Sequence, residues 1–250
     1  MNDIQKRLLD LADRSYRTNT YTFTDFLSLA ELSDYYMIKN QLDFASCKVF
    51  GGYDQCDRAI IRFGNPDALM YDIDFPIVCI HIRPLVKKFA DQLSHRDFLG
   101  ALMNLGIERH TLGDIRIRDN EAYLLCLLSI APYITKNLTK IKHTSVSCKE
   151  VDITSLPLDT FVDEPDTRHI VVSSLRADGI ISKVHNLSRN DSLTLFKSQK
   201  VFINGRLCEN NSVNVKAGDI INARGFGKFQ ISSDAKETKK GRISLCVLIW

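Results

Sequence analysis

The sequence predicts an α+β protein made of three successive folded parts and one linker. Three observations predict this class. Residues 75–153 alternate β-branched runs with two helical stretches, and residues 175–208 carry two amphipathic helices followed by a hairpin signal. Charge is also divided unevenly along the chain. We expect a small α/β region at 1–74, a central α-β plait at 75–153, a linker at 154–166 and a C-terminal module at 167–250.

Composition is that of a folded, soluble chain of one to three domains: 250 residues, 44% apolar and 25% charged. Residues 166–250 hold 14 Lys and Arg against 7 Asp and Glu, a balance of +7. Residues 1–165 hold 19 against 23, a balance of −4. This asymmetry predicts that the basic end meets a polyanion, and the alternative is a basic face that only keeps the surface solvated.

The N-terminal part begins with a helix whose apolar face is formed by Ile4, Leu8, Leu9, Leu11 and Ala12. A second helix is expected at about 25–37, and strands at 48–50 and 59–63. Between the strands, Gly51 and Gly52 open the segment 51–58. No Gly-Lys-Ser/Thr follows them, so the pattern favours a tight turn over a phosphate-binding loop.

The central part predicts the order strand, helix, strand, strand, helix, strand. The strands are expected at 76–83, 115–117, 122–127 and 144–151, and the helices at 94–105 and 129–140. Ser94 and Asp97 form a capping-box pattern, and Asp119-Asn120 marks a turn. This order is that of the split βαβ, or RRM-like, plait. Such a sheet offers a nucleic-acid platform when aromatic residues line it, and Tyr123 is the one obvious candidate.

The C-terminal part predicts a helix with the apolar face Leu175, Ile180, Ile181, Val184 and Leu187, followed by a helix that Ser188 caps. Asn204-Gly205 predicts a type I′ hairpin between 201–203 and 206–208. A strand at 220–224 leads into 225–229, whose two glycines allow close approach of a partner. We expect the apolar run 243–250 to pair with an earlier strand.

The seven cysteines predict buried thiols in a reducing compartment, because they form no C-x-x-C pair and none has zinc-finger spacing to a histidine. Met1-Asn2-Asp3 leads into an amphipathic helix and not into a signal peptide. The apolar stretch 122–134 is too short to span a bilayer. We therefore expect a cytoplasmic protein without a membrane contact.

Four landmarks in the basic part occur in order: Arg176-x-Asp178, Leu187-Ser188-Arg189, Val201-Phe202-Ile203-Asn204-Gly205 and Val215-Lys216-Ala217-Gly218-Asp219. Their order resembles the αL RNA-binding motif of S-four-like domains, named after a small-subunit ribosomal protein. The resemblance covers about 55 residues and implies a two-helix and hairpin module that binds folded RNA. Asn190-Asp191 departs from the family, whose members carry small or basic residues there. Asp191 is expected either to lower affinity or to complement the helix start.

A wider resemblance covers most of the chain. Its landmarks are Gly51-Gly52-Tyr53 with Asp57-Arg58, the run 93–102, Leu105-Gly106-Ile107-x-Arg109, Gly113-Asp114-Ile115 and Arg224-Gly225-Phe226-Gly227-Lys228-Phe229. They resemble the YlmH-type RNA-binding proteins, whose members carry Glu-Arg in place of Asp57-Arg58. The resemblance implies a cytoplasmic protein whose C-terminal module binds rRNA of the large ribosomal subunit. It also implies a link to quality control of stalled peptidyl-tRNA and to cell division.

These observations predict a non-catalytic protein that binds structured RNA, namely rRNA of the large ribosomal subunit and, as a further candidate, tRNA. No DNA, cofactor or metal is expected. The expected RNA contacts lie on one cationic surface: Arg176, Lys183, Ser188, Arg189, Lys197, Lys200, Asn204, Arg206, Arg224 and Lys228. Arg189 is the strongest single candidate, because it follows a helix start where backbone amides also favour anions.

Two other functions stay open at this point. An RNA-modifying enzyme could use the same module as an anchor, although neither a pseudouridine-synthase loop nor the glycine-rich turn of a methyltransferase is found. Residues 1–150 could instead dock a protein while the basic module tethers them. His95-Arg96-Asp97 predicts a helix cap and not an acid–base pair.

Overall fold

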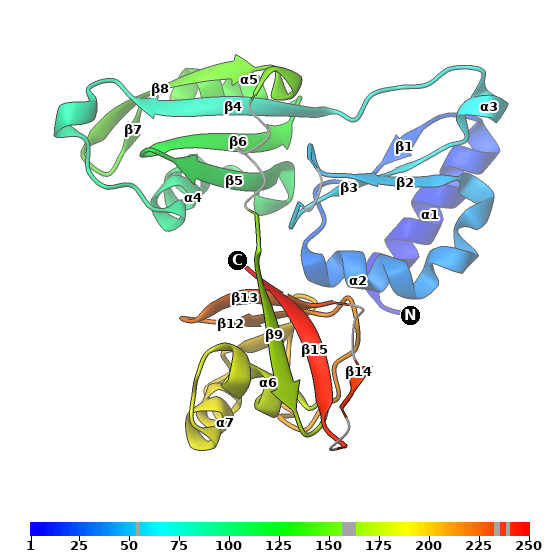
Figure 1. Cartoon of the computed structure of the whole chain (residues 1–250). Helices are drawn as coiled ribbons and strands as arrows, with labels where there is room; N and C mark the ends of the chain where they lie inside the picture. Colours follow the sequence, from blue (N-terminus) through cyan, green and yellow to red (C-terminus); the bar gives the residue numbers. More distant parts are fainter. Residues whose placement is uncertain (54–55, 157–163, 233–235, 239–240) are drawn as a thin grey trace. The chain divides into compact units, whose positions relative to one another are not determined.

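The structure, a computed structural model, describes residues 1–53, 56–156, 164–232, 236–238 and 241–250. It divides the chain into two compact units, Met1–Val162 and Asp163–Trp250, and each is described here by itself (Figure 1). The division falls inside the predicted linker, of which 157–163 lie outside the described residues. The linker prediction is wrong at its end, because Asp166 begins a strand.

The N-terminal part of the first unit is a three-stranded antiparallel sheet with two long helices and one short helix. Its elements are α1 (Asp3–Thr18), β1 (Thr22–Phe23), α2 (Leu29–Ile38), β2 (Cys47–Phe50), β3 (Ile60–Phe63) and α3 (Pro66–Leu69), with strand order β1-β3-β2. Capping boxes start both long helices: Asn2 with Gln5, and Ser28 with Glu31. The expected start of the second helix near residue 25 is too early, because Leu27 still pairs with Ala59 in an extended bridge.

The glycine pair is a tight turn, as the missing P-loop residues predicted. Gly52 has a φ of 105°, which a side chain rarely adopts. A Cβ on Gly51 would lie 2.2 Å from the Arg58 carbonyl oxygen. Asp54 and Gln55 of this segment lie outside the described residues.

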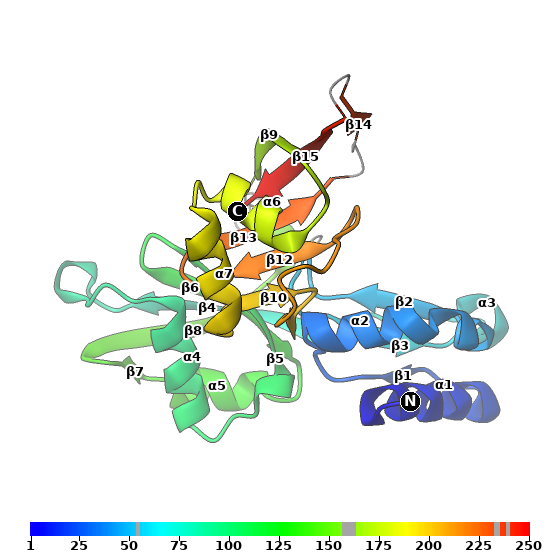
Figure 2. The same cartoon turned by 90° about the horizontal axis from the view of Figure 1, so that it is seen from below.

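The rest of the first unit is a five-stranded antiparallel sheet covered by two helices (Figure 2). Its elements are β4 (Ile77–Pro84), α4 (His95–Asn104), β5 (Leu112–Arg118), β6 (Glu121–Leu127), α5 (Ala131–Asn137), β7 (Lys140–Ile141) and β8 (Thr144–Val151), with strand order β5-β6-β4-β8-β7. The capping box is confirmed, since Ser94 N and Oγ donate to Asp97 Oδ2 at 2.9 and 2.6 Å. The helix expected at 129–140 is shorter, because Pro132 lies in its first turn and the β7 residues pair with β8.

Two core clusters fill the first unit, and a third joins them. Phe98, Leu102 and Ile134 pack on Ile80 and Leu124 between the helices and the five-stranded sheet. A separate cluster lies between α1, α2 and the three-stranded sheet. The joining cluster consists of Phe26, Ile60, Cys79 and Leu125, all 0–1% exposed. The three-stranded and five-stranded sheets therefore belong to one compact unit.

The second unit is a seven-stranded antiparallel sheet with two helices on one face. Its elements are β9 (Asp166–Val172), α6 (Ala177–Val184), α7 (Arg189–Lys197), β10 (Val201–Ile203), β11 (Arg206–Leu207), β12 (Ile220–Ala223), β13 (Gly227–Ile231), β14 (Lys236–Glu237) and β15 (Ile243–Ile249). The strand order is β11-β10-β12-β13-β15-β14, and β9 also pairs with β15. The hairpin at Asn204-Gly205 and the paired final strand are confirmed.

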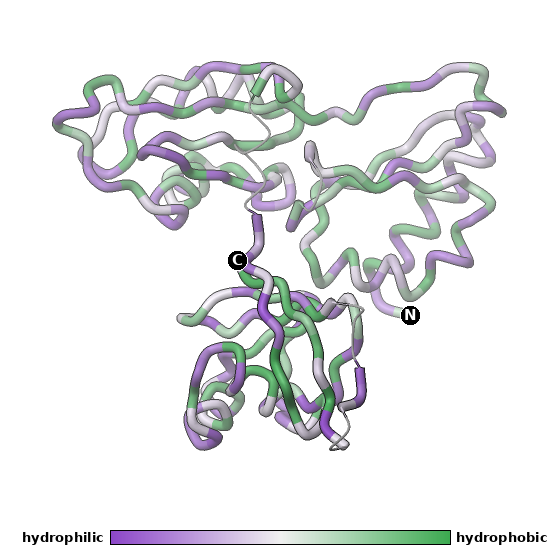
Figure 3. Tube along the Cα trace, viewed as in Figure 1, coloured by the Kyte–Doolittle hydropathy of each residue, from purple (hydrophilic) through white to green (hydrophobic). Residues whose placement is uncertain are grey.

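β15 is the apolar centre of this unit. It is coloured as hydrophobic over most of its length (Figure 3), and Leu245 and Val247 are fully buried. β9 was not expected from the sequence, because polar Thr167, Arg168 and His169 interrupt its apolar pattern. Gly225 lies in the turn between β12 and β13, and Gly227 begins β13, with φ values of 94° and 119°.

Candidate nucleic-acid interface

Two of the predicted RNA contacts meet at a pocket of about 380 Å³ in the second unit. The pocket lies where the N-terminal ends of α6 and α7 come together, and Arg176, Asp178, Arg189 and Asn211 supply its charged and amide groups. The two helices are joined by a short connection and pack against each other. The sequence placed Arg176 and Arg189 on separate helices, and only the packing of these helices brings them to one pocket.

Arg176 is held in position by a bidentate ion pair. Its Nε and Nη2 donate to the two carboxylate oxygens of Asp178 at 3.1 and 2.6 Å. Asn211 Nδ2 also donates to Asp178, at 3.1 Å. The Arg176 hydrogen bond lowers the pKa of Asp178 and raises that of Arg176. The side chain of Arg176 stays 44% exposed, so its guanidinium is ordered and still meets solvent.

Arg189 is the first residue of α7, and Ser188 is its N-cap. Ser188 Oγ accepts from Asp191 N at 3.1 Å and donates to Asp191 Oδ2 at 2.7 Å. Asp191 therefore completes the helix start, which is one of the two roles expected for it. Arg189 is exposed and lines the pocket. Amides in the first turn of a helix have no helical carbonyl to bond, which makes this end favourable for an anion.

The other predicted contacts do not all share this surface. Lys183 is exposed on α6, while Lys197 and Lys200 are exposed at the far end of α7. Arg206 is exposed at the hairpin. Lys228, on β13, faces away from α6 and α7, because its neighbour Phe229 is buried in the core below the helices. Arg224 is the first residue of the turn after β12, and its guanidinium lies over the ring of Phe202, which shares the face of Lys228. The expectation of one cationic surface is therefore wrong for Arg224 and Lys228.

Asn204 has a structural role in the hairpin. Its φ is 50°, its Nδ2 donates to Asp219 Oδ1 at 2.9 Å, and its Oδ1 accepts from Ile220 N at 2.9 Å. Asp219 Oδ2 in turn accepts from Lys216 N at 2.8 Å. These bonds tie the hairpin to the turn before β12, which explains why Asn204-Gly205 and Lys216-Ala217-Gly218-Asp219 occur together in the sequence.

The central sheet carries a row of four aligned side chains, of which the sequence predicted only Tyr123. Strand register aligns Arg116, Tyr123, His81 and Lys149 across β5, β6, β4 and β8. The His81 and Tyr123 rings stack with centroids 4.6 Å apart and an interplanar angle of 1°. His81 Nε2 lies 2.6 Å from Glu121, which also pairs with Lys87. His81 was missed because nothing local in the sequence shows which residue lies opposite Tyr123.

Several landmark residues of the wider resemblance form a buried polar cluster in the first unit. Asp114 Oδ2 accepts from Tyr53 Oη at 2.6 Å and from Asp57 N at 2.8 Å. Arg58 Nε donates to the Leu112 carbonyl at 2.9 Å, and Nη2 donates to that of Phe26 at 2.7 Å. These bonds join segments far apart in the sequence, so the cluster is a structural clamp.

Burial perturbs the ionisable groups of this clamp. It raises the pKa of Asp114 and lowers that of Arg109 to about 10, in the second case together with the charge of Arg58. Arg109 Nη1 donates to the carbonyls of Leu112 and Gly113 at 2.8 and 3.1 Å. Burial and the Arg109 charge lower the pKa of His95, which lies at the start of α4.

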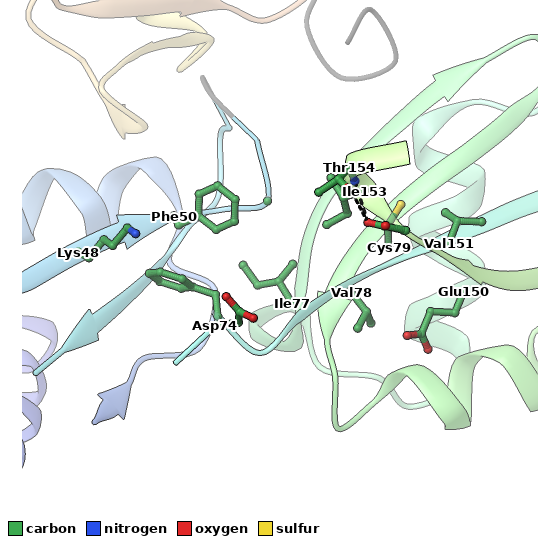
Figure 4. A pocket seen from close by; sticks show the side chains of 13 residues that line it. Lys48, Phe50, Asp74, Ile77, Val78, Cys79, Glu150, Val151, Ile153 and Thr154 are labelled. Carbon is green, nitrogen blue, oxygen red and sulfur yellow. Dashed lines mark hydrogen bonds between the residues drawn. The ribbon is translucent and has the colours of Figure 1, made fainter. Parts of the chain in front are cut away.

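A pocket of about 820 Å³ lies in the first unit beside β2, β4 and β8 (Figure 4). The rings of Phe50 and Phe75 form one wall, with centroids 5.4 Å apart. Asp74, Glu150 and Asp152 line it against a single cation, Lys48. This balance is unfavourable for a phosphate backbone.

Among the described residues, no cluster of three His, Cys, Asp or Glu side chains could hold a metal ion. All seven cysteines are thiols and none is in a disulfide. None of the helices that the structure describes is long and apolar enough to cross a bilayer.

Residues 71–155 match a family model described as "Putative RNA-binding domain in YlmH". The chain belongs to the YlmH family, since a curated relative shares 30% identity with it over 223 residues, which is 88% of this chain and 83% of the relative. That relative is the ribosome-associated protein quality control protein P2 of Bacillus subtilis (strain 168). A solved structure, the cell division protein ylmH from Streptococcus pneumoniae, is similar at 20% identity and a TM-score of 0.47, covering 62% of this chain and 94% of that chain.

Proposed function

We propose that this protein is a non-catalytic, ribosome-associated RNA-binding protein. The observation that carries the proposal is the meeting of Arg176, Ser188 and Arg189 at the adjoining ends of α6 and α7, in the basic unit of a chain from the YlmH family. The finer assignment is rRNA of the large subunit as the partner, with peptidyl-tRNA as a second contact, in ribosome-associated quality control. The cytoplasm is the compartment that this function requires.

We assign the RNA contact of the second unit to its helical face, formed by Arg176, Lys183, Ser188 and Arg189. Lys197, Lys200 and Arg206 extend this contact along the end of α7 and the hairpin. The exposed guanidinium of Arg189 beside a helix start suits phosphate and sugar oxygens, so the face recognises RNA shape more than base identity. This arrangement supports the αL, S-four-like type of module that the sequence resembles.

For the first unit we propose that residues 75–153 are an RRM-like plait and that the row Arg116, Tyr123, His81 and Lys149 is their RNA contact. Two cations flank two stacked rings there, and the family model covers the same residues. Residues 1–74 then act as a separate part that packs on this plait through Phe26 and Ile60. The acidic pocket beside them is the place for a basic protein contact, not for RNA.

The test is co-sedimentation of the full chain with ribosomal subunits. Reversing Arg189 and Lys183 to Glu removes two cations from the helical face, and each charged hydrogen bond is worth about 1.5–3 kcal/mol. We expect at least about a tenfold loss of affinity for the large subunit. The double variant Lys6→Glu and Lys136→Glu makes the same change of net charge on exposed helix positions of the first unit and should bind nearly normally. Equal affinity of both double variants would reject the helical face as the contact.

The enzymatic alternative has less support, because neither the family description nor the name of the relative refers to a catalysed reaction. Incubation of the protein with rRNA followed by nucleoside analysis tests it. Formation of a modified nucleoside in proportion to protein would favour the enzyme.

A further inference from the structure

We propose that the solvent-facing side of the C-terminal sheet is a second RNA contact, which stacks unpaired nucleobases on Phe202 and Trp250. This outer sheet face consists of Phe202, Asn222, Arg224, Lys228 and Trp250. The inference rests on the proposed RNA-binding function, but it concerns the side of the unit that faces away from α6 and α7.

Strand register places the five side chains on one face. Phe202 lies opposite Asn222, and Asn222 opposite Lys228. Trp250 N donates to the Lys228 carbonyl at 3.0 Å, which continues the row. Arg224 begins the turn after β12, and its guanidinium lies over the Phe202 ring, which places it on the same face. The intervening residues Val201, Ile221, Ala223 and Phe229 are fully buried under the helices, so the row itself faces outward.

Each of the two rings is paired with a cation. The guanidinium carbon of Arg224 lies 4.3 Å from the Phe202 centroid, and Lys228 Nζ lies 5.5 Å from the Trp250 ring. Arg224 and Asn222 are exposed, and the rings are half-buried. A guanidinium held flat on a ring extends the planar surface and adds positive charge. Rings of this kind with nearby cations suit nucleobases whose phosphates need neutralising.

Charge complementarity selects the occupant. Among the described residues, no Asp or Glu occupies an outward position of the four central strands β10, β12, β13 and β15, or the position that directly follows β12 or β15. These positions hold Phe202, Ile220, Asn222, Arg224, Lys228, Gln230, Ser244, Cys246, Leu248 and Trp250. A basic protein would find no partner for its charges there. A paired helix would present phosphates but no exposed base faces. Unpaired RNA nucleotides offer both phosphates and base faces, so they are the occupant that fits.

Trp250 makes the test direct, because it is the one tryptophan in the sequence. The full chain is titrated with a hexamer of adenylate ribonucleotides, and with an abasic hexamer of the same charge, while tryptophan fluorescence is followed. We expect saturable quenching by the adenylate hexamer and little by the abasic one. Phe202→Ala should weaken binding of the adenylate hexamer roughly 5- to 150-fold, the range for one stacked base.

Arg224 supplies a second variant that leaves the core intact, since its side chain is exposed. Arg224→Gln removes both charge and stacking, whereas Arg224→Lys keeps the charge alone, so we expect weaker binding in both and the larger loss in Arg224→Gln. Lys216→Gln, at an exposed turn, is the control for loss of one cation. Equal quenching by the abasic hexamer, or normal affinity of both Arg224 variants, would overturn the proposal.

The two proposals fail separately. Arg189→Glu with Lys183→Glu should weaken ribosome binding and leave the adenylate quenching of Trp250 in place. If ribosome binding survives that double variant, the helical face is rejected whatever the fluorescence shows. If ribosome binding falls but the hexamer never quenches Trp250, only the outer sheet face is rejected.

Discussion

His185, at the end of α6, is a half-buried residue whose Nε2 atom is buried. Its ring lies 5.6 Å from Phe229 and 5.7 Å from Phe226, and its Nε2 has no hydrogen-bond partner among the described residues. Burial and then the charge of Arg168 lower its pKa. The folded state therefore favours the neutral form of this imidazole.

Acidification should destabilise the protein through His185. Because the pKa of this base is lower in the folded state, the unfolded state takes up the proton first, and stability falls as pH drops below about 6.5. We expect His185→Leu to flatten the dependence of the urea midpoint on pH between about 7 and 5. His95, whose pKa is lowered too, contributes the remaining slope. The exposed His143→Gln variant is the control, and an unchanged slope in His185→Leu would contradict this role.

Asp97 also makes the folded state less stable on acidification, but at lower pH. Its Oδ2 accepts from Lys142 Nζ at 2.7 Å and from Ser94, which lower its pKa to about 2. An acid with a lowered pKa stabilises the fold above its unfolded value of about 3.9, and the stabilisation is lost as pH falls toward 2. We expect Asp97→Asn to melt below wild type at pH 6 and the two curves to converge by about pH 2. A constant difference in melting temperature across this range would show that charge is not the cause.

At the scale of elements, local signals located most helices and strands. The capping box at Ser94 and the turn at Asp119-Asn120 act within four residues, and both are present as their patterns predict. The capping box at Ser28 is equally local, but the sequence analysis did not identify it. The errors occur where distant residues decide. Leu27 stays extended because Ala59 pairs with it, and the β7 residues leave the expected helix because they pair with β8.

The start of α7 is capped by Ser188, which also belongs to the proposed RNA contact. Ser188→Ala removes the acceptor of the Asp191 amide and should lower the free energy of unfolding by about 1 kcal/mol. Ser188→Asp restores an acceptor, so it should recover most of the stability while its charge weakens RNA binding. Chemical denaturation and ribosome co-sedimentation measure the two effects. Ser198→Ala, at the other end of α7, is the control, and parallel loss of both properties in Ser188→Asp would contradict this separation.

At the scale of the whole molecule, the net charge is basic only in the C-terminal part, residues 166–250. The first 165 residues have a net negative charge. Residues 71–155, which match the family model, lie within this acidic part. If RNA binding depends on the second unit, its strength follows the number of phosphates that the cationic faces neutralise.

Affinity for RNA should therefore fall steeply with salt. With about five phosphates neutralised, the slope of log K against log salt is expected near −4. Arg189→Glu with Lys183→Glu should make the slope less steep by about two, because each contact contributes about one. Fluorescence anisotropy with a labelled rRNA fragment, measured from about 50 to about 300 mM salt, gives both slopes. A slope near zero would mean that phosphates are not the contact.

The sequence by itself determined the α+β class, most caps and turns, the basic C-terminal part and the membership of the YlmH family. These depend on signals that act between residues close together or on composition. Only the tertiary structure decided that β9 joins β15, that His81 stacks on Tyr123, and that Arg224 and Lys228 face away from Arg189. Those outcomes depend on which strands pair and on which face of a sheet the helices cover. Strand pairing and burial join segments that lie many residues apart, so no local signal in the sequence specifies them.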